Sequence, residues 1–156
     1  MIACTLETLL ESKEALLFVE NLSLPFSVSY RISKQLAAVF AEIATAEKKQ
    51  QGILKSLHDA GLGRPDGRGG EYYQAPVVPP RDAPLEAQQG YEVMLTTWTL
   101  AQQQLEEMRT FETQINCEPI KVDDLRNKPM QQGQRAPEEN VLPSAVLRKA
   151  AFLLTE

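Results

Sequence analysis

A long run of apolar residues, spaced three and four positions apart, constrains the fold of this chain most. These residues are Val28, Ile32, Leu36, Val39, Phe40, Ile43, Ile53, Leu54 and Leu57. The spacing places their side chains on one face of an α-helix. It predicts a helix over residues 25–60, roughly 50 Å long at ~1.5 Å per residue. Pro25 suits the first turn, where its missing N–H would have no partner, and Gly61 suits the left-handed position that follows the last turn.

A second apolar stripe predicts a partner for this helix. Its members are Tyr91, Met94, Leu95, Trp98, Ala101, Leu105, Met108, Phe111 and Ile115. We expect a helix over residues 83–116 that runs antiparallel to the first and forms a long helical hairpin with it. Trp98 is expected to be a core residue of that hairpin.

Shorter elements flank the two long helices. A helix is expected over residues 5–22, with Thr5 as its N-cap. Residues 117–125 are expected to form a short strand and a turn, with "YYQAPVV" (72–78) as the strand's partner if it has one. A polar linker is expected over residues 126–141 and a C-terminal helix over 142–154. The prediction is therefore a mainly α chain, one domain over 1–156, with a minor two-stranded β element.

The segment at residues 61–82 is rich in glycine and proline, and it raises the question of phosphate binding. Five of the eight glycines lie between Gly61 and Tyr73. A P-loop requires lysine and a hydroxyl residue after its last glycine, but Glu71 stands there instead. A dinucleotide-binding loop follows a strand and precedes a helix, whereas this segment follows a helix. We therefore predict a flexible tip and no bound cofactor.

This tip also holds the candidate contact residues. Its two arginines suggest docking on an acidic surface. Its tyrosines and valines are apolar side chains in a segment too rich in glycine and proline to build its own core. They either cover the end of the hairpin or bind a partner. The six candidates for partner contact are Arg64, Arg68, Tyr72, Tyr73, Val77 and Val78.

Residue patterns typical of catalysis or metal binding are missing from the sequence. The only histidine, His58, falls in the last turn of the first long helix, where a positive charge suits the helix dipole. Its neighbour Asp59 would point away from it. Cys4 and Cys117 are far apart in sequence, which favours two reduced cysteines over a zinc site or a disulfide framework. We predict no catalytic residue, no metal and no enzyme activity.

The charge balance bears on the partners. Sixteen basic and 21 acidic residues give a net charge of −5, which disfavours a nucleic-acid-binding protein. No segment is apolar over the ~18 residues that a membrane span needs, and the acidic start of the sequence is unlike a signal peptide. We therefore expect contact with neither nucleic acid nor membrane.

The order of these features resembles a group of small, mostly uncharacterised helical proteins encoded by bacteriophages and prophages. The resemblance is carried by "LSLPFSVSYRISK" (22–34), by the Phe111–Glu112 pair in "RTFETQI", by "PIKVDDL" (119–125) and by the terminal "VLPSAVLRKAAFLL" (141–154). It implies a phage context and assigns no chemistry.

Together these observations predict a non-enzymatic phage protein that acts by protein–protein contact. We expect a virion or tail accessory protein, or an assembly component, that forms homo-oligomers and is found in the host cytoplasm or the virion. The alternative is an acidic inhibitor that binds a host defence or regulatory protein. The long apolar stripes motivate the first function, and the net charge of −5 motivates the second.

Overall fold

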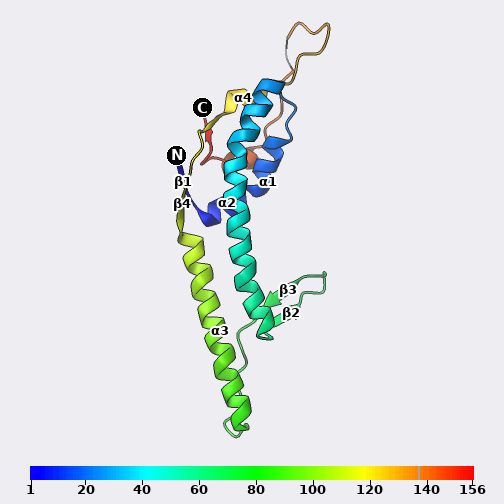
Figure 1. Ribbon diagram of the computed structural model, residues 1–156. Helices are drawn as coiled ribbons and strands as arrows, with labels where there is room; N and C mark the ends of the chain where they lie inside the picture. The colour runs from blue at the N-terminus through cyan, green and yellow to red at the C-terminus, as the bar shows by residue number, and fades with distance from the viewer. Residues whose placement is uncertain (137) are drawn as a thin grey trace. The chain divides into compact units, whose positions relative to one another are not determined.

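The structure is a computed structural model that describes residues 1–136 and 138–156, and its fold is mainly α (Figure 1). Helices make up 55% of it. The described helices are α1 (Leu6–Glu20), α2 (Phe26–Asp59), α3 (Leu85–Thr110), α4 (Val122–Arg126) and α5 (Ser144–Lys149). Residue contacts divide the chain into two compact units, residues 1–46 with 110–156 and residues 47–109. Helix α2 contributes residues to both units. The single domain over 1–156 stays a prediction.

The first two helices were predicted correctly, because local capping groups mark their ends. The Thr5 hydroxyl accepts a hydrogen bond from the N–H of Thr8 at 3.2 Å and caps the start of α1. At the end of α2, Gly61 adopts a φ of 76°. The N–H of Gly61 then donates to the His58 carbonyl, and the N–H of Leu62 donates to the Leu57 carbonyl. These two bonds form the Schellman motif that ends many helices.

The first unit contains a strand pair that the sequence did not predict. Strand β1 (Ile2–Thr5) pairs antiparallel with β4 (Glu112–Ile115), with Ile2 opposite Ile115. The prediction of helix through residue 116 was therefore wrong for 112–115. Ile115 continues the helical spacing of α3, but it also lies two residues from half-buried Thr113, as on the inner face of a strand. The pairing with β1 shows that residues 112–115 form a strand and not a last turn of helix.

A second strand pair in this unit corrects the predicted partner of the 117–125 segment. Strand β5 (Ile120–Lys121) pairs in parallel with β6 (Leu154–Thr155), not with residues 72–78. The predicted C-terminal helix is accordingly shorter: α5 ends at Lys149, and the chain turns back toward β5. The N–H of Ile120 donates to the Leu153 carbonyl at 2.8 Å and joins the two segments.

Apolar side chains from α1, α2, the strands and the C-terminal segment form the core of the first unit. Its largest fully buried members are Leu9, Leu16, Val19, Ile32, Leu36, Val39, Ile43, Ile115, Ile120, Leu125 and Leu153. At its surface, Arg31 pairs with Asp124 at 2.7 Å. The predicted linker is anchored at its end, where the Asn140 side chain donates to the carbonyls of Ser23 and Leu125.

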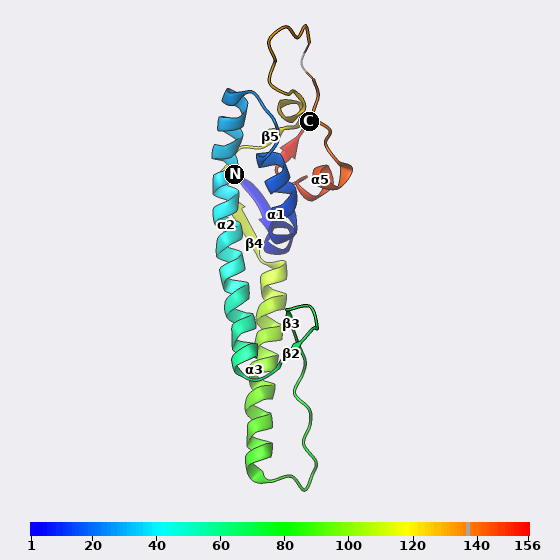
Figure 2. The ribbon, with the colours of Figure 1, turned by 90° about the vertical axis from the view of Figure 1, so that its right-hand side faces the viewer.

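The second unit consists of the C-terminal part of α2, a short hairpin and α3 (Figure 2). Strands β2 (Gly63–Pro65) and β3 (Glu71–Tyr73) pair antiparallel and form the hairpin. Leu57, Leu62 and Ala101 are buried together, with Trp98 and Tyr73 partly buried against them. The end of α2 therefore packs against the middle of α3, in agreement with the predicted mainly α fold with a helical hairpin.

Candidate functional site

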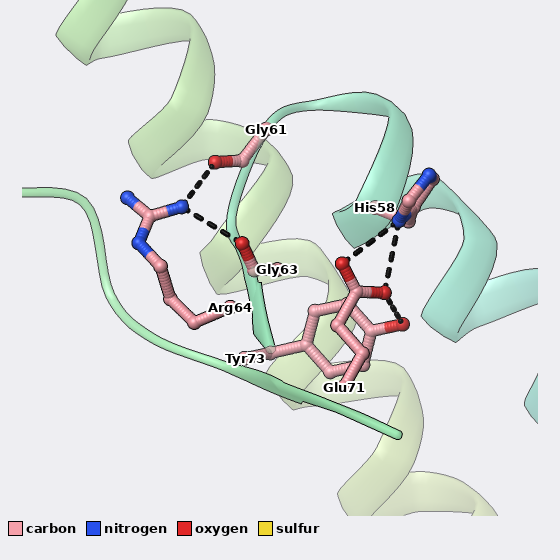
Figure 3. A network of polar contacts seen from close by, with 6 residues as sticks. All are labelled: His58, Gly61, Gly63, Arg64, Glu71 and Tyr73. Atoms are coloured by element: carbon pink, nitrogen blue, oxygen red, sulfur yellow. Dashed lines mark hydrogen bonds and ion pairs between the residues drawn. The ribbon is translucent and has the colours of Figure 1, made fainter. Parts of the chain in front are cut away.

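The glycine- and proline-rich tip begins with the β2–β3 hairpin, whose base is fixed to the end of α2. His58 Nδ1 lies 2.9 Å from both carboxylate oxygens of Glu71, and the Tyr73 hydroxyl donates to Glu71 Oε2 at 3.0 Å (Figure 3). We call these three residues the His58–Glu71–Tyr73 cluster. The hydrogen bond from His58 lowers the pKa of Glu71. Burial, followed by the bond to Glu71, raises the pKa of Tyr73. The cluster attaches β3 to the last turn of α2.

This cluster resembles a catalytic carboxylate–imidazole pair, but its surroundings do not support catalysis. A nucleophile activated by histidine must lie within hydrogen-bond reach of the ring. In the described chain, the hydrogen bonds of His58 go to Glu71. The nearby Ser56 hydroxyl donates to the Ile53 carbonyl of its own helix at 2.6 Å. The arrangement therefore stabilises the hairpin base. The sequence missed it, because Glu71 lies 13 residues from His58 and was considered only as a departure from the P-loop pattern.

The loop between β2 and β3, which holds the glycine cluster Gly67, Gly69 and Gly70, is closed by hydrogen bonds to the side chain of Asp66. Asp66 Oδ1 accepts hydrogen bonds from the backbone N–H groups of Arg68 at 2.7 Å and Gly70 at 3.0 Å. These amides are the groups that a phosphate cradle would direct at its ligand. A carboxylate already occupies them, so a phosphate would meet a negative charge at that place. This geometry favours the predicted tip over a nucleotide-binding loop.

The two arginines of the tip differ in their surroundings. The Arg64 guanidinium donates to the carbonyls of Gly61 at 3.0 Å and Gly63 at 2.8 Å, so it helps to hold the turn after α2. Arg68 is exposed at the end of the hairpin. Of the two, Arg68 is the better placed to meet an acidic surface.

The four apolar candidates divide between the two interpretations that the sequence left open. Tyr73 is half-buried and packs on the cluster of Leu57, Leu62 and Ala101. It therefore covers the end of the helical hairpin of α2 and α3. Tyr72 is 46% exposed, while Val77 and Val78 are 86% and 70% exposed. These three side chains are available to a partner, and their role in binding stays a prediction.

Helix α3 carries a larger apolar surface than the tip. All 26 residues of α3 are described, and Ala101 is the one that is buried. Its exposed large apolar residues are Leu85, Val93, Met94, Leu95 and Leu100. Leu95 and Leu100 also line a groove of about 370 Å³ together with Thr96, Thr99 and Gln103. Of the apolar stripe predicted for residues 83–116, Met94, Leu95 and Phe111 are exposed. The seven-residue spacing of Val93 and Leu100 was the signal for this second face.

The first unit presents an aromatic pair at the start of α2, in the "SYRISK" region. The rings of Phe26 and Tyr30 stack with their centroids 6.0 Å apart, and Lys34 Nζ lies 5.4 Å from the Tyr30 ring centroid. Phe26 is 83% exposed and Tyr30 is 57% exposed. Arg31 of this region is exposed and pairs with Asp124.

The two cysteines lie in the first unit and are poorly suited to nucleophilic chemistry. Burial raises the pKa of Cys4 and of Cys117, and the charge of Cys117 adds to the effect on Cys4. The two thiols, distant in sequence, thus come close enough in space to interact, and both favour the unreactive protonated form. A groove of about 550 Å³ lies beside α4, where Asp123 and Arg126 form an ion pair at 3.6 Å. Across the residues that the structure describes, no group of three or more His, Cys, Asp or Glu side chains could hold a metal.

In comparisons with known proteins, no family model, no curated protein and no solved structure matches this chain. In the described part of the chain, no helix combines the length and the apolar character needed to cross a membrane.

Proposed function

We propose that this chain is a non-enzymatic phage protein that acts by protein–protein contact, as a virion or tail accessory protein or an assembly component that self-associates. The observation that carries the proposal is the surface of α3. Ala101 is the buried residue of this 26-residue helix, and Leu85, Val93, Met94, Leu95 and Leu100 are exposed to water. Exposed apolar patches on a folded protein mark interaction surfaces.

The arrangement of the exposed residues on α3 supports a second copy of the chain as its partner. Val93 and Leu100 are seven residues apart, so they lie two turns apart on nearly the same line of the helix. Apolar residues at a seven-residue interval are the contact positions of helices that pair side by side. A two-fold pair of α3 helices would cover both side chains.

The phage context comes from the resemblance of the whole pattern, from "LSLPFSVSYRISK" to "VLPSAVLRKAAFLL". The non-enzymatic role is supported by the two sites at which chemistry was most plausible. The carboxylate of Glu71 is committed to His58 at the base of a hairpin, and the amides of the glycine cluster are committed to Asp66.

An affinity pull-down from producing cells, read by mass spectrometry, tests this function. The bait is the full chain, and the control bait carries Leu100→Glu on the exposed face of α3. Capsid or tail proteins that are captured by the wild-type chain and lost with the control would support the proposal. A single host defence or regulatory protein as the dominant capture would instead support the inhibitor function.

A further inference from the structure

The start of α2 carries three long, exposed side chains in one row. Phe26, Tyr30 and Lys34 follow one another at four-residue intervals, so each lies one turn beyond the last on the same side of the helix. The rings of Phe26 and Tyr30 stack with 20° between their planes, and the Lys34 ammonium lies over the Tyr30 ring. We call these three residues the aromatic–lysine ridge. Each side chain contacts the next, so the ridge is ordered before any partner binds, which lowers the entropy cost of binding.

One side of the aromatic–lysine ridge is flanked by the chain itself. The Arg31 guanidinium pairs with Asp124 of α4, and the Gln35 side chain donates to the Glu118 carbonyl at 3.3 Å. Figure 1 shows α4 beside the start of α2. A partner that reaches the ridge would therefore approach from its other side.

The row of residues on that other side is low. Ser29, Ser33, Ala37 and Ala41 also follow one another at four-residue intervals, and all four have short side chains. Ser29 and Ser33 are half-buried, whereas Ala37 and Ala41 are exposed. Helices pack by placing a row of side chains of one helix into a low row of the other. From Phe26 to Ala41 this surface is about 22 Å long, which fits a partner helix of about four turns.

Lys34 gives this surface a positive charge. Among the residues that the structure describes, no ion pair joins Lys34 to a carboxylate. The neighbouring cation, Arg31, is already paired with Asp124 at 2.7 Å. The ridge therefore begins with an exposed aromatic ring and ends, about 12 Å further along the helix, with an ammonium group that a partner's carboxylate can pair with.

From the ridge, the low row and the charge, we infer that this surface of α2 binds a helix of another protein that carries a large apolar side chain and a carboxylate two turns apart. The apolar side chain packs on the rings of Phe26 and Tyr30, and the carboxylate pairs with Lys34. Two helical turns span about 11 Å, which matches the spacing of Phe26 and Lys34. Aromatic side chains such as Tyr30 carry much of the binding energy of protein interfaces, and the charge selects an acidic partner.

This inference goes beyond self-association, and it rests on the proposed function in one respect, since both require that the chain works through protein contact. The surfaces differ, however. Self-association uses Val93 and Leu100 on α3, whereas the partner helix uses Phe26, Tyr30 and Lys34 on α2. Each can therefore fail while the other holds. The binding experiment uses the full chain both as the wild type and with Val93→Glu and Leu100→Glu, and both forms should bind equally.

A display library of single helices, randomised along one face, tests the inference with the full chain as the target. We expect the selected helices to carry Asp or Glu seven or eight residues from a large apolar residue, because that spacing covers two turns. If the library yields no binding helix, or if the selected helices lack an acidic residue, the inference is wrong.

Two lysines of α2 provide a matched pair of variants. Lys34→Glu should weaken the binding of a selected helix by about tenfold, as should Tyr30→Ala, while Lys55→Glu should leave it unchanged. Lys55 is an exposed lysine nearer the end of α2. A selected helix with lysine in place of its acidic residue should bind the Lys34→Glu chain better than the wild type. Equal losses for Lys34→Glu and Lys55→Glu would mean non-specific charge attraction and would overturn the inference.

A second copy of this chain is the other possible occupant of the surface. Light scattering on the same variants separates the two cases, and circular dichroism confirms that each variant is folded. Lys34→Glu should leave the mass of the wild-type assembly unchanged. A lower mass with Lys34→Glu would show that a second copy covers the aromatic–lysine ridge, and it would overturn the inference of a different protein as the partner.

Discussion

His58 Nδ1 lies 2.9 Å from both carboxylate oxygens of Glu71, so one ring nitrogen joins the last turn of α2 to the first residue of β3. The contact closes a loop that contains most of the glycines in the chain. Tyr73 adds a hydrogen bond to the same carboxylate and packs its ring on the buried cluster of the second unit. The tip is thus fixed at its base, although its composition suggested flexibility throughout.

The stability of the second unit should depend on pH through Glu71. The pKa of Glu71 is lowered, mainly by the hydrogen bond from His58. As the pH falls, the unfolded chain takes up this proton before the folded chain does. The contact therefore contributes fully above the unfolded glutamate pKa of about 4.3, and the contribution is lost as the pH falls through the lower folded value. Urea unfolding of the wild type and Glu71→Gln should give different stabilities at pH 7 and equal ones at strongly acidic pH.

The matched control is Glu92→Gln on α3. The Glu92 side chain is exposed and makes none of the side-chain contacts found in the described residues. Its variant should unfold like the wild type at every pH. A Glu71→Gln chain that is as stable as the wild type at pH 7 would show that the His58–Glu71–Tyr73 cluster adds nothing.

Two glycine variants should change stability in opposite directions. A Cβ added at Gly63 would collide with the Glu71 carboxylate. Gly63→Ala should therefore displace Glu71 from His58 and lower the free energy of unfolding. A Cβ at Gly52, inside α2, meets nothing within 4 Å. Gly52→Ala should raise stability by ~0.5–1 kcal/mol. Thermal unfolding of both variants measures the difference, and a stabilising Gly63→Ala would contradict the account.

Trp98→Ala should destabilise the protein moderately. Trp98 is half-buried against the cluster of Leu57, Leu62 and Ala101 rather than enclosed in it. The expected loss is therefore about 2 kcal/mol, below the ~3–5 kcal/mol of a fully buried tryptophan. Denaturant unfolding followed by circular dichroism measures it. An unchanged midpoint would mean that α3 does not pack on the end of α2 through this face.

Cys4 and Cys117 should react slowly with iodoacetamide while the protein is folded. Burial raises the pKa of both thiols, so little of the reactive thiolate exists near pH 7.5. Labelling of the native chain should be much slower than labelling in urea and should accelerate as the pH rises. Equal rates in the folded and unfolded chain would contradict the burial of these residues.

Much of the α fold could be predicted because its signals are local. Thr5 marks a helix start, Gly61 marks a helix end, and the 28–57 stripe spans eight turns. A strand was predicted within residues 117–125, where β5 lies, but its partner β6 and the β1–β4 pair were not predicted, because the paired segments are distant in sequence. Residues 112–115 continue the helical pattern of α3 in the sequence. They form a strand because they pair with β1, which lies more than 100 residues earlier in the chain. Strand β6 has two residues and therefore has no periodicity of its own to detect.

The candidate site was predicted only in part, because local signals reveal composition but not contacts between distant residues. Composition alone located the exposed Val77 and Val78. The contact of His58 with Glu71 and the hydrogen bonds of Asp66 depend on the fold of the hairpin, which no spacing rule gives. The spacing of apolar residues on α3 could not show which of them are exposed, because a helix with one close neighbour covers only one face.

The measurement that tests the central claim most directly is the mass of the protein in solution, determined by light scattering after gel filtration. The wild type should be a dimer or a higher oligomer at micromolar concentration. Val93→Glu with Leu100→Glu should give a folded monomer, because two charges would stand on the paired face of α3. Gln102→Glu is the control, because its exposed side chain points about 200° around the helix from Leu100, and it should remain an oligomer. A wild-type chain that elutes as a monomer with the mass of one copy would contradict self-association through α3.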